Sequence, residues 1–394
     1  MKVKVDELQA SLLSSPLPQP LRRPVQGGQV TIYKRDCLLV RARANQGQVG
    51  YGVGTPSPNV AQLINRNLRA AVVGLNPANL AGLRRKVFQR RPRYPGLVQA
   101  FAAVEMALLD LQGRIAGCPL SELLGGRVRG RVRIHASGGV YLDGEEIVRE
   151  AGLWAGSGFS ACKLELGRSP RQDLQTVREL REAFPAPWGI MVDARAWRGG
   201  HYGLEETARL LREMAPSRLE WVEEPVAPND RGALRPLLKD CRVPLSWGGG
   251  ESSLEGGLDL ARLDRPNLLQ LDVLHLGGLI DGQRALREVQ PLGRRVAIGR
   301  LSTPLEAAAL AQLASCFGVD LVGWMEWPQY SGEGRSGTYP FRLAEQMLHT
   351  PLWIDKGEVI VPESPGLGVK VNESVIRRFP FRTGPCSSFQ PAGP

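Results

Sequence analysis

The sequence of 394 residues is poor in several features that mark particular classes of protein. It has no run of about 18 uncharged apolar residues, and its start has no continuous apolar segment before a cleavage site, which disfavours a membrane span and a secretory signal. The six cysteines lie far apart and form no CxxC pair, which argues against a zinc knuckle, a redox motif and a disulfide framework. These absences predict a soluble cytoplasmic protein with no membrane partner.

Basic residues outnumber acidic ones, giving a formal net charge of +11 and an isoelectric point near 9.7. Such a charge makes nucleic acid a partner to consider. However, the basic residues are spread among apolar positions, and no aromatic-rich strand accompanies them. We therefore expect a solvated basic surface, or steering of anionic substrates, and no nucleic-acid partner.

The pattern of the sequence changes about a third of the way along the chain. Two strand-like runs between Gln29 and Val53 are followed by helical patterns, which predicts an α+β cap. Further on, eight strand-like segments alternate with seven or more helices, which favours a closed parallel barrel over an open sheet. We divide the chain into a capping domain (1–128), a barrel (129–335), a segment returning to the cap (336–380) and a disordered Pro/Ser/Gly-rich tail (381–394).

Three carboxylates close short apolar runs at a regular interval. Asp193, Glu223 and Glu251 stand 30 and 28 positions apart (223 − 193 and 251 − 223). An interval of about 30 residues fits one strand plus one return helix, so each acid would end its own parallel strand, where barrel enzymes carry their chemistry. Side chains alternate along strands, so the same barrel mouth would receive further charged residues. These are Lys163, Glu165, Arg195 and Asp272.

The charge of this predicted mouth needs compensation. Five acids and two bases leave a net charge of −3 (2 − 5), and crowded carboxylates either shift their pKa values upward or require a cation. A divalent ion would reduce the charge to −1. Oxygen ligands without a histidine or cysteine pair favour Mg²⁺ over Zn²⁺. The alternative is a salt-bridged rim in which the Arg195 guanidinium stands where an ion otherwise would.

On these residues, the chain resembles the enolase superfamily, mandelate racemase/muconate lactonizing enzyme family, over nearly its whole length. The segment FAAVEMALLDLQGRIAGCPLSELLGG and the order of the strand ends carry the resemblance together with the hairpin cap. It implies a (β/α)7β modified TIM barrel with an α+β capping domain formed by the N-terminal region and the C-terminal segment. It also implies bound Mg²⁺, abstraction of the proton alpha to a substrate carboxylate, an enolate intermediate, and a homo-oligomer.

The resemblance assigns roles to individual residues. Lys163 matches the first lysine of a Lys-x-Lys pair, Asp272 in LQLDVLHLGG matches an aspartate that orients a catalytic histidine, and Glu326 in GWMEWP matches an acid that hydrogen-bonds the enolate. The three metal ligands would be Asp193 in VDARAW, Glu223 in WVEEP and Glu251 in GGGES.

Four departures from the family pattern concern the same site. Glu165 replaces the second lysine, Gly299 with Arg300 beside it replaces a histidine, and Arg195 replaces an asparagine. The segment WGGGES is two residues longer than usual before its acid. Both usual bases are therefore absent.

The sequence leaves few candidates for moving a proton. Glu165 or Lys163 would do so, while His275 and His201, the histidines nearest the mouth in sequence, are interpreted as surface or supporting residues. The candidate catalytic residues are Lys163, Glu165, Asp272, Arg300 and Glu326. We expect a Mg²⁺-dependent lyase or isomerase, of dehydratase, racemase or epimerase type, acting on a hydroxy or sugar-acid carboxylate. The alternative is a catalytically degenerate relative that binds an anionic ligand without turnover.

Overall fold

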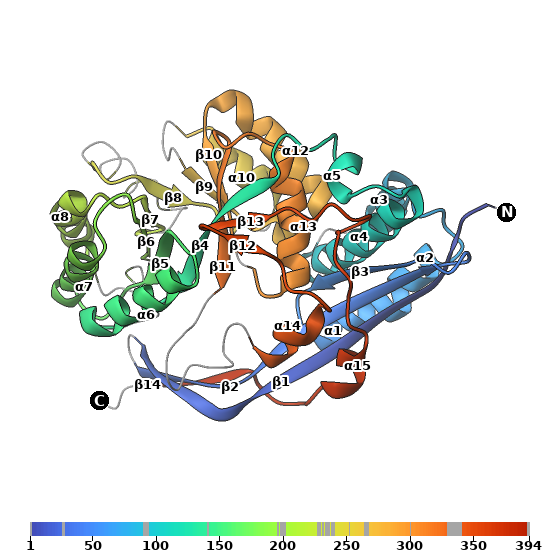
Figure 1. Ribbon diagram of the computed structural model, residues 1–394, viewed down its shortest axis with the longest axis horizontal. Helices are drawn as coiled ribbons and strands as arrows, with labels where there is room; N and C mark the ends of the chain where they lie inside the picture. Colours follow the sequence, from blue (N-terminus) through green and yellow to red (C-terminus); the bar gives the residue numbers. More distant parts are fainter. Residues whose placement is uncertain are drawn as a thin grey trace.

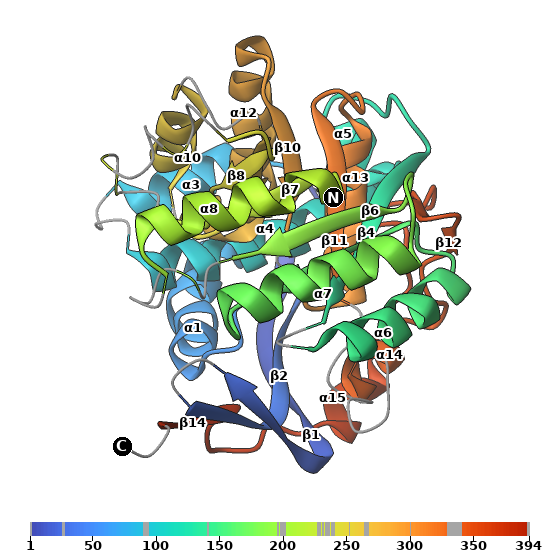
Figure 2. The same cartoon turned by 90° about the vertical axis from the view of Figure 1, so that its left-hand side faces the viewer.

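A computed structural model shows a sheet-and-helix cap beside a barrel (Figures 1 and 2). The structure describes residues 2–25, 28–89, 94–139, 142–194, 197, 202–226, 230, 232, 237, 241–251, 253–263, 268–299, 301–328 and 341–391. No helix within these ranges is both long enough and apolar enough to cross a lipid bilayer.

The cap is built on three antiparallel strands, β1 (Val5–Val25), β2 (Gly28–Ala44) and β3 (Val49–Gly54). The predicted hairpin corresponds to β2 and β3. The long strand β1 was not predicted, because prolines interrupt its alternating pattern and a proline cannot donate a backbone hydrogen bond. Its register against β2 shifts between Pro16 and Leu21, which accommodates them.

Helices cover one face of this sheet. The central one, α4 (Pro95–Ala116), begins with proline in its first turn and ends at Gly117 in the left-handed conformation (φ 70°). It lies close to β3, where an added Cβ at Gly50 or Gly52 would collide with the α4 backbone. The other helical segments of the cap are α1 (Pro58–Gln62), η1 (Leu63–Leu68), α2 (Arg69–Val72), α3 (Leu80–Phe88) and α5 (Leu120–Leu123).

Eight parallel strands form a closed barrel, because the last one, β11, also pairs with the first, β4. This confirms the predicted fold class. In order around the barrel they are β4 (Arg131–Gly138), β5 (Ala161–Glu165), β6 (Gly189–Asp193), β7 (Trp221–Glu223), β8 (Leu245–Trp247), β9 (Leu268–Leu271), β10 (Arg295–Ile298) and β11 (Val322–Pro328).

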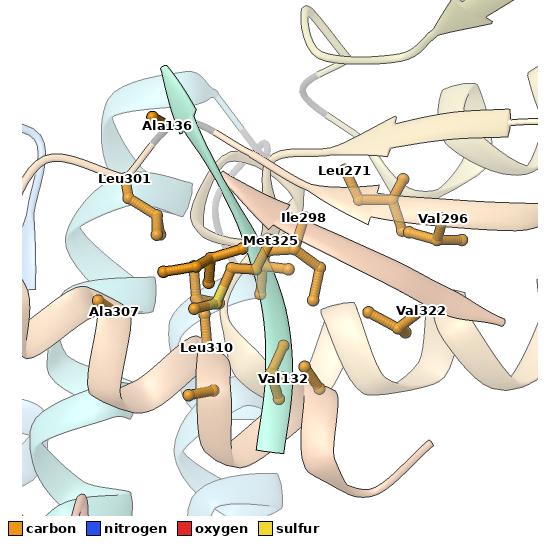
Figure 3. Packing of buried hydrophobic residues seen from close by; sticks show 14 of the residues in the cluster. Val132, Ala136, Leu271, Val296, Ile298, Leu301, Ala307, Leu310, Val322 and Met325 are labelled. Atoms are coloured by element: carbon orange, nitrogen blue, oxygen red, sulfur yellow. The ribbon is translucent and has the colours of Figure 1, made fainter. Parts of the chain in front are cut away.

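Helices ring the barrel (Figure 2). The helices are α6 (Gly144–Gly156), α7 (Pro170–Ala183), α8 (Leu204–Met214), α10 (Leu254–Ala261), α11 (Val273–Leu276), α12 (Leu279–Val289) and α13 (Pro304–Ser315). Two short 3₁₀ turns lie between them, η3 (Ala215–Ser217) after α8 and η4 (Gln290–Leu292) after α12. Outward-facing strand residues such as Val132, Ile298 and Met325 pack with Leu310 of α13 in the main core (Figure 3).

The C-terminal segment joins both parts of the molecule. Its elements are α14 (Arg342–Met347), β12 (Ile354–Asp355), β13 (Glu358–Ile360), α15 (Ser374–Arg378) and β14 (Ser387–Pro391). Strand β13 pairs with β4 of the barrel, and beyond α15 the Ser14 amide donates to the Phe379 carbonyl at 3.1 Å, so the segment does return to the cap.

The prediction of a disordered tail is wrong for residues 387–391. Strand β14 pairs antiparallel with the first part of β2, and the Tyr33 and Ser388 hydroxyls lie 2.8 Å apart. Composition predicted disorder because these residues have little apolar surface to bury. The strand is formed instead by backbone hydrogen bonds to a partner more than 300 positions away, which local composition does not reveal.

Candidate active site

Buried charged side chains gather where β5, β6 and β7 end. Asp193 and Glu223 are the last residues of β6 and β7, and they are direct register partners. Glu165 ends β5 and is in turn the partner of Asp193. Lys163 precedes Glu165 by two residues and is 5% exposed, as is Asp193, while Glu223 is 2% exposed. The predicted alternation thus puts these side chains at one end of the barrel.

Lys163 is the centre of this group. Its ammonium donates to Glu223 Oε2 at 2.8 Å and to Glu326 Oε2 at 3.4 Å. Burial by itself lowers the pKa of Lys163, but the Glu223, Glu326 and Asp193 carboxylates outweigh it and hold the pKa above its usual value. Lys163 is therefore a fixed positive charge at neutral pH.

Gln270 belongs to the same group and was not predicted. Its side-chain amide donates to Glu223 Oε2 at 3.1 Å. This carboxylate oxygen therefore accepts hydrogen bonds from both Lys163 and Gln270. The signal was present in the sequence, because Gln270 precedes Asp272 by two residues and so shares its side of the strand.

A neutral aromatic layer lies next to the charged group inside the barrel. The His135 imidazole, fully buried on β4, packs edge-on against Trp221 at 5.5 Å and Trp324 at 6.2 Å between ring centroids. Burial, followed by the positive charge of Lys163, lowers the pKa of His135 to about 3. Neither ring nitrogen has a hydrogen-bond partner among the described residues. Sequence analysis missed this histidine because it sits inside a strand rather than at a strand end.

Glu251 does not join the group. It lies four residues beyond the end of β8 (251 − 247), and its carboxylate lies against the first turn of α10, where an added Cβ at Gly256 would collide with it. Burial raises the pKa of Glu251, and the negative charge of Asp259 on α10 adds to the effect. The residue of this connection that faces the group is Gly249, whose added Cβ would lie 3.2 Å from Glu223 Oε1.

The Asp272 carboxylate pairs with the imidazole of His275, which lies in the helix that Asp272 caps. The resemblance implied a different histidine, at the position of Gly299. The Asp272 carboxylate caps α11 by accepting from the His275 amide at 3.1 Å, and its Oδ2 lies 2.7 Å from His275 Nδ1. His275 Nε2 lies 3.2 Å from the side-chain nitrogen of Gln99 on α4. At the position expected for a histidine, an added Cβ on Gly299 would lie 3.0 Å from Glu326 Oε2.

Three residues named from the sequence lie outside the described residues. They are Arg195, His201 and Arg300. The interpretation in which the Arg195 guanidinium stands in place of an ion therefore stays a prediction, as does a catalytic role for Arg300.

The donor set can be compared with what Mg²⁺ requires. Asp193 and Glu223 offer hard oxygen ligands on adjacent strands, but Lys163 and Gln270 both donate to one oxygen of Glu223. Across the described ranges, no three histidine, cysteine, aspartate or glutamate side chains gather closely enough to hold a metal ion. Of the three predicted ligands, Asp193 and Glu223 lie together and Glu251 does not, so the described residues do not fit the predicted three-carboxylate magnesium centre.

Two family models match the chain. "Mandelate racemase / muconate lactonizing enzyme, N-terminal domain" matches residues 12–125, and "Enolase C-terminal domain-like" matches residues 146–375. The second match alone covers more than half of the chain.

Curated proteins match it along nearly their whole length. D-galactarolactone cycloisomerase of Agrobacterium fabrum is 26% identical over 91% of this chain and 95% of its own. Chloromuconate cycloisomerase of Cupriavidus pinatubonensis is 28% identical over 96% and 99%. N-succinyl-L-Arg/Lys racemase of Bacillus cereus is 21% identical over 91% and 94%. The relatives are thus cycloisomerases and racemases.

Solved structures agree with the fold. A Bordetella bronchiseptica RB50 protein complexed with 2-oxoglutarate/phosphate superposes with a TM-score of 0.85 at 25% identity, covering 98% of this chain and 100% of that one. An enolase from Pantoea ananatis with bound D-gluconate and magnesium gives 0.78 at 18% identity, covering 97% and 96%. The first binds a small carboxylate, and the second binds both a small carboxylate and a metal ion.

Proposed function

Because the chain belongs to the mandelate racemase/muconate lactonizing enzyme family of the enolase superfamily, we propose that it is a lyase or isomerase acting on a small hydroxy or sugar-acid carboxylate. The reaction would pass through an enolate. One observation carries the proposal: the buried Lys163 ammonium, held charged beside Glu223 and Glu326 at the barrel mouth. A fixed positive charge at this depth is suited to an anionic substrate.

Lys163 would act as an electrostatic group. Its ammonium would bind the substrate carboxylate and stabilise the negative charge that builds on it as the enolate forms. Its raised pKa argues against a role as the base, because a lysine that keeps its proton cannot accept another. Glu326, whose Oε2 accepts from the Lys163 ammonium, would help to position that ammonium, and its own hydrogen bond to the enolate stays a prediction.

Glu165 would move the proton. It ends β5 two residues after Lys163, and side chains two apart share a direction along a strand. As the α-carbon–hydrogen bond breaks, the proton would pass to the Glu165 carboxylate, and the bonding electron pair would form the enolate double bond. Delivery of a proton to the opposite face of the same carbon gives racemisation or epimerisation, whereas loss of a β-hydroxyl, which takes up a proton and leaves as water, gives a lyase product. Asp272 would keep His275 oriented, and Arg300 stays a predicted participant.

The predicted ligand set for Mg²⁺, Asp193, Glu223 and Glu251, also stays a prediction. Asp193 and Glu223 are suitable oxygen donors, while the carboxylate of Glu251 lies against α10. No step above uses the ion, because the three side chains do not converge.

A second candidate function is favoured by the β8–β10 side of the mouth. Glu251 is directed elsewhere, and Gly299 leaves no imidazole at its strand end. A protein with these two changes would bind an anionic ligand at Lys163 without turning it over. The two candidates share the binding group and differ in proton transfer.

Solvent exchange separates them. The protein would be incubated in D₂O with a panel of hydroxy and sugar-acid carboxylates, with and without MgCl₂, and α-deuteration followed by NMR. We expect exchange with at least one acid, and its loss in Glu165→Gln with substrate binding retained. A rise in melting temperature with an acid that shows no exchange would favour the binding protein. If no acid of the panel shows exchange and none shifts the melting temperature, both candidates are rejected.

A further inference from the structure

The connection after β8 differs from those after β6 and β7. Asp193 and Glu223 are strand-end acids facing the mouth. On β8 the register partner of Glu223 is Ser246, and Gly249, two residues beyond the end of that strand, adjoins the Glu223 carboxylate. An added Cβ there would lie 3.2 Å from Glu223 Oε1 and 3.8 Å from Gln270 Cβ. The next acid along the chain, Glu251, follows two residues later.

A backbone turn places Glu251 beyond the barrel mouth. Its amide donates to the Gly248 carbonyl at 3.0 Å, which closes a turn that begins with Gly248 at a φ of +115°. The carboxylate then lies at the first turn of α10, next to Gly256 and the capping residue Ser253. The Glu251 carboxylate thus lies beside α10, away from the Glu223 carboxylate.

One oxygen of the Glu223 carboxylate already accepts from two donors. The ammonium of Lys163 lies 2.8 Å from Glu223 Oε2, and the Gln270 amide donates to the same oxygen. A divalent ion bound to Glu223 would stand close to a permanent positive charge, which weakens its binding.

We propose that this chain has lost the third metal ligand of its centre, and that Gly249 occupies the position of that ligand. Divalent cations then bind weakly, through Asp193 and Glu223, with a dissociation constant on the order of millimolar. The inference rests on the proposed function only in taking the strand-end residues as the site.

Placing a carboxylate at residue 249 tests it. The backbone of Gly249 is outside the left-handed region, so it is compatible with an L-residue. An added Cβ requires its neighbours to move by a few tenths of an ångström, and this cost is the same in Gly249→Asp and in the matched control Gly249→Ala. Isothermal titration calorimetry with MgCl₂ at constant ionic strength would be run on both variants, the wild type and Glu251→Gln. We expect Gly249→Asp to bind at least tenfold more tightly than Gly249→Ala, and Glu251→Gln to match the wild type.

Two results would overturn the proposal. One is no gain of Gly249→Asp over Gly249→Ala when both melt cooperatively. The other is micromolar binding by the wild type that weakens at least tenfold in Glu251→Gln, because Glu251 would then be the third ligand. The second comparison needs no change at residue 249, so it decides the matter even where Gly249→Asp does not fold. Proton exchange plays no part in either readout, so the proposed function and this inference can fail separately.

Discussion

The two halves of the barrel mouth behave differently. On the side of β5, β6, β7 and β11, the residues predicted from the sequence meet: Lys163 bridges Glu223 and Glu326, with Asp193 beside them. On the side of β8, β9 and β10, Glu251 lies against α10, Asp272 pairs with His275, and a glycine follows the last residue of β10. The first half holds the connected charges, to which β9 contributes Gln270, whereas Glu251 and Asp272 of the second half lie at the first turns of local helices.

The difference reflects where each residue lies relative to its strand. Lys163, Asp193 and Glu223 are inside strands, where the twofold alternation of side chains fixes their direction. Glu251 lies beyond the end of β8, after three consecutive glycines, and no periodicity fixes its direction there. A carboxylate at the expected spacing thus does not ensure a carboxylate at the expected place.

Removing Lys163, in the charged half of the mouth, is expected to have the largest effect on stability and on proton exchange. In Lys163→Met, the buried Glu223 and the partly buried Glu326 lose the Lys163 ammonium, so we expect a loss of about 3 kcal/mol in unfolding free energy. The rate of α-proton exchange should fall by about 10²- to 10³-fold. Urea denaturation and the deuterium assay measure the two quantities.

Glu251→Gln is the matched variant from the other half. Among the described residues its partly exposed carboxylate forms no ion pair, so stability should change by less than about 0.5 kcal/mol in urea denaturation. Comparable losses in the two variants would mean that both halves form one site, contrary to the contrast drawn here.

The sequence predicted most of the fold, and it predicted that Lys163, Asp193 and Glu223 lie together at the strand ends. Barrel strands and cap helices were recognised because their apolar residues repeat with periods of two and 3.6. Strand β1 was missed because prolines mask its pattern, and β14 because its partner is distant in sequence. The pairing of Asp272 with His275 required knowledge of a short helix, α11, in which the two residues lie three positions apart.

A moderate effect is expected at Glu306, in the half without a buried lysine. Burial raises the pKa of this carboxyl to about 7 from its usual 4.5, despite donors from Ser302, and the Asp272 charge adds to the shift. Between these two pH values the folded protein keeps a proton that the unfolded chain has released. Glu306 therefore costs stability as pH rises through the window, and the full cost is present above it.

Glu306→Gln removes this titration. The unfolding free energy of the variant minus that of the wild type should rise with pH across this window, by up to about 1.4 kcal/mol per pH unit. Urea unfolding at about pH 5 and about pH 7.5 measures the difference, and other titrating groups cancel because both proteins contain them. A difference that stays constant with pH would show that Glu306 is ionised in the folded state throughout.

The smallest effect is expected on the surface of the same half. Arg262 and Asp259 form an ion pair at 3.0 Å at the end of α10, with side chains 61% and 63% exposed. Solvent screens such a pair, so Arg262→Ala should change stability by less than about 0.5 kcal/mol in a denaturation experiment. A larger loss would mean that α10 depends on its outer surface, and that the placement of Glu251 against it is less independent than it looks.

Strand β14 has a consequence for handling the protein. It covers the edge of β2 over Gly28–Ile32, on the side opposite β1. Trimming the chain before residue 387 would leave that row of backbone donors and acceptors open, and open strand edges recruit strands from neighbouring molecules. A truncated preparation should therefore self-associate with rising concentration, and a purification tag on the C-terminus would emerge beside the same edge.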